Sequence, residues 1–253
     1  MNTQFYSEVK KQPQSIRRTL EQYRKDGYST LRHAAEIIRS AQAVVMSGMG
    51  TSYNVCLSAL ESFNRKVRVN AIQSYQLLNT GYAGVQDEDV LILISQSGES
   101  GEISRICRER KDKNSIIAVT NDIYSSLASS ATVVLPLFCK EEKSITNCTF
   151  TATLAVLAML SAAVNGDDVE DVARRLEYGS RIAETFLVDE HTIFSTADIL
   201  GSSDRVHFIG RNGVEMTLAE QAALIFKEGA DCNAQCFNVG SFRHGPMELC
   251  GQN

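Results

Sequence analysis

The sequence predicts an α/β protein with a doubly wound, parallel, five-stranded sheet, followed by an incomplete second unit of the same kind. Short apolar runs alternate with amphipathic stretches between residues 29 and 165, as strands and helices do in such sheets. Two of these runs end in turns rich in glycine or serine, which is typical of ligand-binding strand–helix turns. The pattern begins again at residue 205 and shows at most two strands before residue 253.

The first unit follows an opening helix that carries Ile16, Leu20 and Tyr23 at helical spacing, and we expect Gly27 to break it. A second amphipathic helix is predicted over residues 30–39. Strands are predicted at 43–46, 67–72, 91–94, 115–120 and 132–136, with helices between them. Pro136 marks a strand end or a sheet edge, because proline cannot donate to a ladder. The apolar run near 154–164 is too short to span a bilayer with confidence, so we interpret it as a buried helix.

The second unit contains a strand from residue 205, a helix over about 215–228 and a short strand over 233–237. Half a sheet leaves apolar surface exposed, so we expect either that the chain is a fragment or that a partner covers this face. We divide the chain into an N-terminal helical segment (1–28), a first domain (29–165), a helical connector (166–200) and an incomplete second domain (201–253).

Composition argues against several classes of function. The formal charge of −5 gives no electrostatic support for nucleic-acid binding. Seven scattered cysteines complete no zinc pattern, so we expect reduced thiols and no metal. The N-terminus lacks a secretory apolar core, and we expect a cytoplasmic protein with no membrane contact.

Residues 95–100 read SQSGES and follow the third predicted strand, where a helix begins. Backbone N–H groups at a helix N-terminus, together with nearby hydroxyls, bind anions such as phosphate. The alternative is ordinary helix capping, which serine and threonine favour. The turn at residues 48–53, which reads GMGTSY, follows the strand predicted at 43–46 and leads into the next helix. Two such turns at one edge of a sheet favour a phosphate site.

Two further residues are candidates for proton transfer. Glu228 ends an apolar helix, where the helix dipole does not favour a carboxylate, and a general base is one reason for such a residue. A solvated surface carboxylate is the alternative. His244 is the histidine of a glycine- and proline-containing turn, whereas the other three histidines lie in predicted helices or strands.

Together, residues 48–53, residues 95–100 and the motif Arg243-His244-Gly245-Pro246 resemble the sugar isomerase (SIS) family. The resemblance runs along essentially the whole chain, in the order that the family has. More narrowly, the chain is similar to the isomerase part of glucosamine-6-phosphate synthase and to the SIS-type glucosamine-6-phosphate deaminases and fructosamine-phosphate deglycases.

The resemblance implies two SIS domains and a homodimer whose site is shared across the interface. It implies that Glu228 shuttles a proton between C1 and C2 of the sugar and that His244, from the partner, assists ring opening. No cofactor is implied. The implied phosphate ligands are Ser52, Ser95, Gln96, Ser97 and Ser100, with Thr51 beside them.

Three positions depart from the family pattern. The family has a lysine where Cys148 stands, another lysine at the position of Ile225 and a glutamate at that of Gln221. Loss of two cations and one acid changes the charge of the site and the number of its groups that can donate or accept a proton. Residues 1–253 do not include the synthase's C-terminal tail, with its sugar-reaching lysine, or its glutamine-hydrolysing domain, so we expect no synthesis from glutamine by these residues.

We therefore expect an enzyme that binds a phosphorylated (amino) sugar and couples aldose–ketose isomerisation to deamination or deglycation, without synthesis from glutamine. The alternative, which the three departures favour, is a non-catalytic sugar-phosphate sensor or regulatory subunit. A partner-binding subunit with a vestigial pocket is a third hypothesis.

Overall fold

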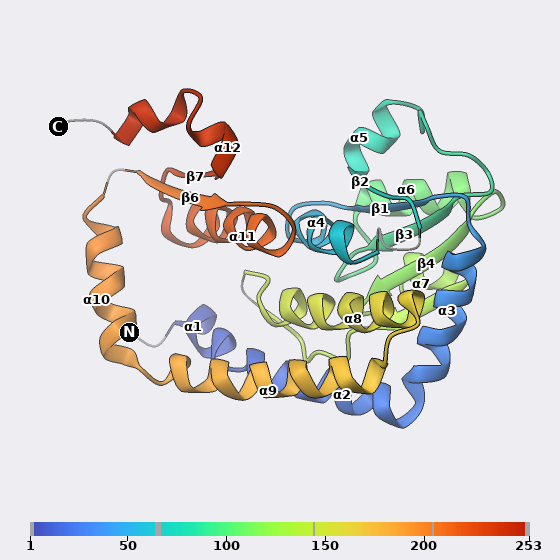
Figure 1. Cartoon of the computed structure of the whole chain (residues 1–253), viewed down its shortest axis with the longest axis horizontal. Coiled ribbons are helices and arrows are strands. Elements are labelled where there is room, and N and C mark those ends of the chain that lie inside the picture. Colours follow the sequence, from blue (N-terminus) through green and yellow to red (C-terminus); the bar gives the residue numbers. More distant parts are fainter. Residues whose placement is uncertain (1–2, 64–66, 144, 204, 251–253) are drawn as a thin grey trace.

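The computed structural model describes residues 3–63, 67–143, 145–203 and 205–250. Five parallel strands form the main sheet in the order β2-β1-β3-β4-β5 (Figure 1). They are β1 (Val44–Gly48), β2 (Val69–Gln73), β3 (Val90–Ile94), β4 (Ser115–Thr120) and β5 (Val133–Pro136). The predicted strands and their parallel arrangement are thus confirmed.

Helices cover both faces of this sheet, as its alternating side chains require. Val90, Ile92 and Ile94 of β3 pack on the side of α3 (Tyr28–Ser40), α4 (Thr51–Phe63) and α8 (Cys148–Asn165). Leu91 and Leu93 point to the other face. That face is covered by α5 (Ser74–Asn79), α6 (Gly101–Arg110) and α7 (Ser126–Ser130). A strand buried on both faces explains why β3 reads as a continuous apolar run.

Helix α8 is apolar all round because it lies inside the protein. Its composition and length would suit a membrane span, yet 72% of it is buried here. It packs against α3, α4, α2 (Gln12–Gln22) and α9 (Val169–Leu187), so each of its sides meets another helix. The interpretation of this run as a buried helix is confirmed.

The break expected at Gly27 takes the form of a π-helical turn, at which the chain changes direction between α2 and α3 (Figure 1). After α1 (Gln4–Val9), α2 runs through a π-helical turn (Tyr23–Gly27) directly into α3. A Cβ on Gly27 would lie 2.5 Å from the ring of Tyr23, which is 1% exposed. Gly27 therefore makes room for a buried aromatic ring at the point where the chain turns from α2 into α3.

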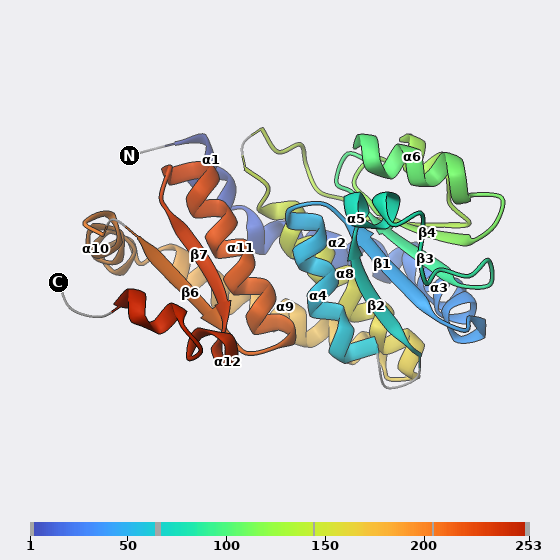
Figure 2. The same cartoon turned by 90° about the horizontal axis from the view of Figure 1, so that it is seen from above.

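The second unit is a two-stranded parallel sheet of β6 (Val206–Gly210) and β7 (Ala234–Asn238), reached through α10 (Glu190–Gly201). Helix α11 (Gly213–Ala230) covers one face of this sheet and also packs against α4 of the first unit, beside which it lies in Figure 2. The other face carries α12 (Val239–Phe242) and a 3-10 turn (Pro246–Cys250) (Figure 1).

Candidate functional site

The turn between β1 and α4 is held close to the end of β3. A Cβ on Gly48 would lie 2.8 Å from Ser52 and 3.0 Å from the carbonyl oxygen of Ile94. Gly50 has a φ of 51°, a left-handed conformation that favours glycine. Thr51 and Ser52 open α4, and no hydrogen bond of their hydroxyls is found among the described residues. Both hydroxyls are therefore available to a ligand at this edge.

Residues 95–100 form the second turn, the serine turn, at the neighbouring strand end. Ser95 is 6% exposed, and its Oγ accepts a hydrogen bond from the Gly98 N–H at 3.1 Å. The Oγ of Ser97 accepts from the Glu99 N–H at 3.2 Å. Gly98, with a φ of 67°, lies against Ser125 of the next turn. The backbone of the serine turn is thus fixed from within and from outside.

Ser100 precedes α6 at the N-cap position, but its side chain makes no capping hydrogen bond. Ordinary capping, by contrast, is seen at Ser125, whose Oγ accepts from the Ala128 N–H at the start of α7. The N-terminal N–H groups of α6 and the Ser100 hydroxyl together offer donors to an anion. This observation favours the anion-site interpretation of Ser100 over the capping interpretation.

Glu99 directs its charge away from the serine turn. Its carboxylate accepts hydrogen bonds from the N–H of Ser126 at 2.5 Å and from the hydroxyl of Ser126 at 2.8 Å. A carboxylate at the N-terminus of α7 is favourably placed relative to that helix dipole. The negative group within residues 95–100 is therefore held at α7 and leaves the N-terminus of α6 open.

Gln96 contributes to the site mainly through its backbone. Its carbonyl oxygen accepts hydrogen bonds from the N–H of Asn121 at 3.0 Å and from the hydroxyl of Thr120 at 3.3 Å. No hydrogen bond of its side-chain amide is found in the described part of the chain, so the amide remains free to reach a ligand.

The C-terminal half of α11 runs along the same edge of the main sheet. Leu224 lies 3.9 Å from the position of a Cβ on Gly50, and Ile145, in the loop before α8, lies 2.8 Å from that of Gly229. Glu228 is exposed and adjoins Gly229. The helix thus brings Glu228 to the region between the glycine turn and the β5–α8 loop.

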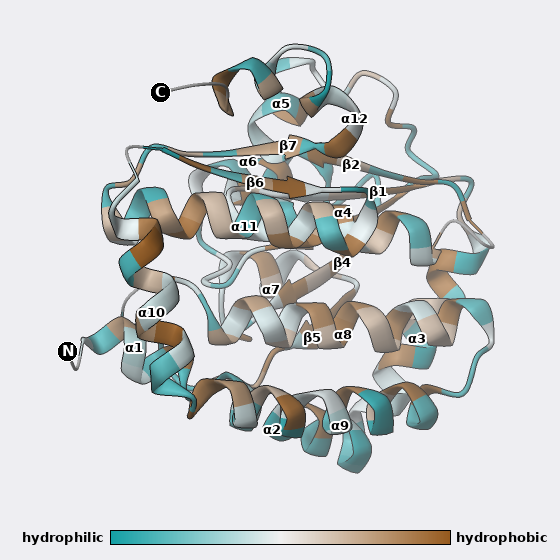
Figure 3. Cartoon of the chain, turned by 60° about the vertical axis from the view of Figure 1, so that its left-hand side comes forward, coloured by the Kyte–Doolittle hydropathy of each residue, from teal (hydrophilic) through white to brown (hydrophobic). Residues whose placement is uncertain are grey.

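His244 lies elsewhere in the chain. It follows α12 and is exposed, and α12 lies across β6–β7 from α11 (Figures 1 and 3). Within one chain, the described residues therefore do not place His244 beside Glu228.

The family departures have local structural counterparts. Gln221 is 3% exposed and accepts a hydrogen bond from the Asn54 amide at 3.1 Å, a contact between α11 and α4 that suits a neutral side chain. Ile225 is half-buried. Cys148 donates from Sγ to the backbone oxygen of Glu8 at 3.4 Å, and burial raises the pKa of its thiol to about 12.

Glu142 caps a helix beside the candidate site, a contact that sequence reasoning missed. Its carboxylate accepts hydrogen bonds from the N–H groups of Asn147 and Cys148 at 2.8 and 2.5 Å and from Thr149. The chain's own carboxylate thus occupies the N-terminus of α8. An acidic residue six positions before an apolar helix was the available signal. Among the described residues, no group of three or more potential metal ligands comes together.

Strand order and the two turns at one edge define a doubly wound α/β protein, and at the carboxyl ends of its strands α6 begins without a side-chain cap. The profile of the SIS domain family matches residues 37–165. The chain belongs to this family, which confirms the resemblance drawn from its motifs.

Individual relatives are distant. The chain is 30% identical over 258 residues to a glutamine–fructose-6-phosphate aminotransferase (isomerizing) of Zymomonas mobilis, covering 96% of this chain and 42% of that protein. Two solved structures share the fold. The tagatose-6-phosphate ketose/aldose isomerase of Escherichia coli has a TM-score of 0.78 at 16% identity and is matched over 98% of this chain and 71% of its own. The glucosamine-6-phosphate deaminase of Thermotoga maritima has a TM-score of 0.75 at 19% identity, and the match covers 98% of this chain and 73% of that chain. The chain spans about two fifths of the curated relatives that it matches.

Proposed function

We propose that the protein binds a phosphorylated (amino) sugar and catalyses aldose–ketose isomerisation coupled to deamination or deglycation. The observation that carries the proposal is the open N-terminus of α6 beside the β1–α4 turn, at the edge that α11 reaches with Glu228. Relatives named for ketose/aldose isomerisation and for deamination of glucosamine 6-phosphate share the fold. We place the protein in the cytoplasm and divide it at residues 28, 165 and 200.

The phosphate is bound in this proposal by the serine turn and the start of α4, through Thr51, Ser52, Ser95, Gln96, Ser97 and Ser100. Hydroxyls, an amide and helix N–H groups suit the charge of a phosphate monoester without a metal ion. The carbon chain then extends along the sheet edge toward Glu228, which acts as the base that moves a proton between C1 and C2.

We further propose a homodimer in which His244 of one protomer serves the site of the other. The position of α12 across β6–β7 from Glu228 supports a contribution from a second chain. Large apolar side chains are exposed on α9 and α10, including Phe186 at 70% and Ile199 at 69%, and hydrophobic segments are visible along α10 and β6 in Figure 3. Exposed apolar surface of this kind is typical of subunit interfaces.

The Glu228→Gln variant tests the catalytic role. Because the substitution removes the base but leaves the phosphate ligands, we expect binding of fructose 6-phosphate within about twofold of wild type and a fall in turnover of at least about a hundredfold. Calorimetry measures binding, and product analysis on glucosamine 6-phosphate and on fructosamine 6-phosphates measures turnover. The matched control is Glu88→Gln, at an exposed glutamate before β3. Wild-type turnover in the Glu228 variant would refute the assignment.

A non-catalytic sugar-phosphate sensor is the second candidate. The neutral, buried Gln221 and the thiol at Cys148, whose raised pKa keeps it protonated, favour it because both positions lack the charge that the family pattern has. A sensor binds sugar phosphates and raises its melting temperature with them, but releases no ammonia, amine or isomerised sugar. Binding without consumption of any 6-phosphosugar would therefore select this candidate.

A further inference from the structure

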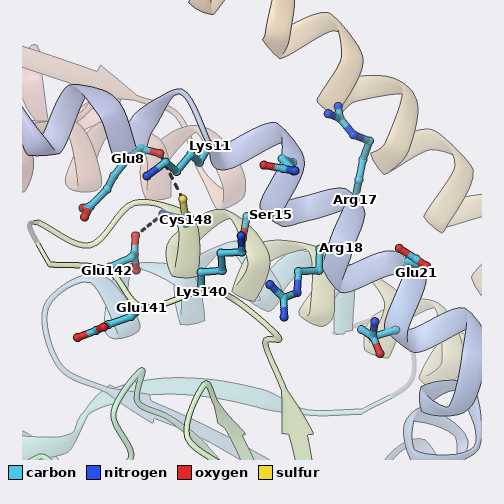
Figure 4. A pocket seen from close by; sticks show the side chains of 12 residues that line it. Glu8, Lys11, Ser15, Arg17, Arg18, Glu21, Lys140, Glu141, Glu142 and Cys148 are labelled. Carbon is cyan, nitrogen blue, oxygen red and sulfur yellow. Dashed lines mark hydrogen bonds between the residues drawn. The ribbon is translucent and has the colours of Figure 1, made fainter. Parts of the chain in front are cut away.

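A cavity of about 600 Å³ opens beside the β5–α8 loop, between this loop and the N-terminal helices (Figure 4). Its size is that of a small-molecule pocket. Most of its walls are charged or polar, and they include Lys11, Ser15, Arg18, Lys140, Glu141 and Cys148. A lining with this many charged side chains suits a charged ligand.

Three cations from two elements face this cavity. Lys11 and Arg18 are seven residues apart, which puts them on one face of α2 at a separation of about 10 Å along its axis. Ser15 lies between them, and its Oγ is 3.1 Å from the Sγ of Cys139. Lys140 follows Cys139 directly, and Figure 4 shows its side chain extending toward Ser15. The side chain of Lys140 therefore lies between those of Lys11 and Arg18.

The acids that line the cavity are largely engaged elsewhere. Glu142 accepts from the N-terminus of α8, and Glu8 accepts from the N–H of Lys143 at 3.0 Å. Glu21 pairs with Lys25 at 2.7 Å, outside the cavity.

One lining cation is likewise engaged, because Arg17 pairs with Glu184 at 2.6 Å. Among the described residues, Lys11, Arg18 and Lys140 have no ion pair, and Glu141 is the remaining unpaired acid of the lining. The lining holds as many acids as bases, but these three cations lie within about 10 Å of one another without an ion pair in the described part of the chain, and an anion bound between them would pair with all three.

We propose that this cavity binds a small phosphorylated metabolite with two phosphate groups, one toward Lys11 and one toward Arg18, with Lys140 between them. The site is separate from the serine turn. Asn121 lies between the two sites, and its N–H donates to the carbonyl oxygen of Gln96. Its side-chain oxygen accepts from the N–H of Cys139 at 2.9 Å, and its side-chain amide donates to the carbonyl oxygen of Cys139 at 3.2 Å. The cavity is therefore two strands along the sheet edge from the serine turn, and its ligand does not depend on the catalytic proposal.

Position-resolved titration tests this inference. Fructose 1,6-bisphosphate serves as the probe and fructose 6-phosphate as the single-phosphate comparison, and amide chemical shifts of the labelled protein locate each ligand. We expect the bisphosphate to shift Ser15, Arg18 and Lys140 and to bind there at least about tenfold more tightly than the monophosphate, because the second phosphate adds charge-assisted contacts. Shifts at Ser97 and Gly98 report the serine turn independently.

The double variant R18Q/K140Q should weaken the bisphosphate at the cavity by about fivefold or more, and S97A should leave that affinity unchanged. R32Q, which removes an exposed arginine of α3 outside the cavity, should change it by less than about twofold. Unshifted cavity amides at millimolar bisphosphate, equal affinity for both sugars, or equal losses in R32Q and R18Q/K140Q would overturn the inference. Absence of shifts at the serine turn alone counts against the catalytic proposal and not against this one.

Discussion

Gly98→Ala is the substitution for which the structure gives the clearest expectation. A Cβ at this position would lie 2.1 Å from the Oγ and 2.5 Å from the Cβ of Ser125. Rotation of the Ser125 side chain relieves the first contact but not the second, because a Cβ is fixed by the backbone. The φ of 67° adds a conformational cost for alanine.

The two costs are of similar size. The left-handed conformation costs about 1 kcal/mol for a residue with a side chain, and forced overpacking costs about 1–3 kcal/mol. We expect a loss of roughly 2–4 kcal/mol in the free energy of unfolding, which corresponds to a fall of about 5–15 °C in Tm for a chain of this length. Displacement of the serine turn should also weaken phosphate binding.

Thermal and urea unfolding measure this loss, and Gly101→Ala is the matched control. Gly101 lies three residues further on, at the start of α6, and a Cβ there meets no atom within 4 Å. Alanine at that position should be neutral or stabilise by up to about 1 kcal/mol. Equal stability of the two variants would refute the steric argument.

The remaining predictions concern charge and thiols. Arg24 contacts Glu170 at 2.9 Å, and hydrogen bonds from Tyr28 and then Arg24 hold the pKa of Glu170 below its usual value. A lowered folded-state pKa stabilises above the ordinary glutamate value, so Arg24→Gln should cost up to about 1 kcal/mol at neutral pH, and the cost should shrink as pH falls through the folded-state pKa. Urea midpoints at neutral and acid pH measure this, and a cost independent of pH would contradict it. Iodoacetamide near neutral pH should modify exposed Cys250 at least about tenfold faster than buried Cys148, whose pKa is raised to about 12. Peptide mass spectrometry measures both rates, and equal rates would contradict the burial of Cys148.

Local patterns predict most of the fold because the strands of the main sheet are buried on both faces and appear as apolar runs. The sequence predicts a break at Gly27 but not its form as a π-helical turn, because the role of Gly27 depends on Tyr23, one turn earlier, whose ring packs where a side chain would stand. Propensity marks glycine as a helix breaker, but it does not describe a tertiary contact that requires one. The bounds of the helices differ from the predicted ones by a few residues for the same reason.

The candidate site was predictable in part. The two turns lie at neighbouring strand ends because β1 and β3 pair in parallel, which the alternation of strands and helices already implied. The approach of Gly229 to Ile145 joins residues that are far apart in sequence, so no spacing rule shows it. The cavity went unrecognised because Lys11 and Arg18 gain meaning only when Lys140, from a loop, is brought against the same face of α2.

Two carboxylates of the chain itself occupy helix N-termini at this edge of the sheet, where a free anion would otherwise bind. A helix N-terminus is a general anion receptor, and an edge with several of them would bind phosphate in several registers. Glu142 at α8 and Glu99 at α7 already accept the N–H groups at the start of their helices, and because they are tethered there they compete with a free anion for those groups. If the proposed function holds, a phosphate is thereby kept from these two helices and left with the starts of α6 and α4, so that the position of the sugar is set before its carbon chain makes any contact.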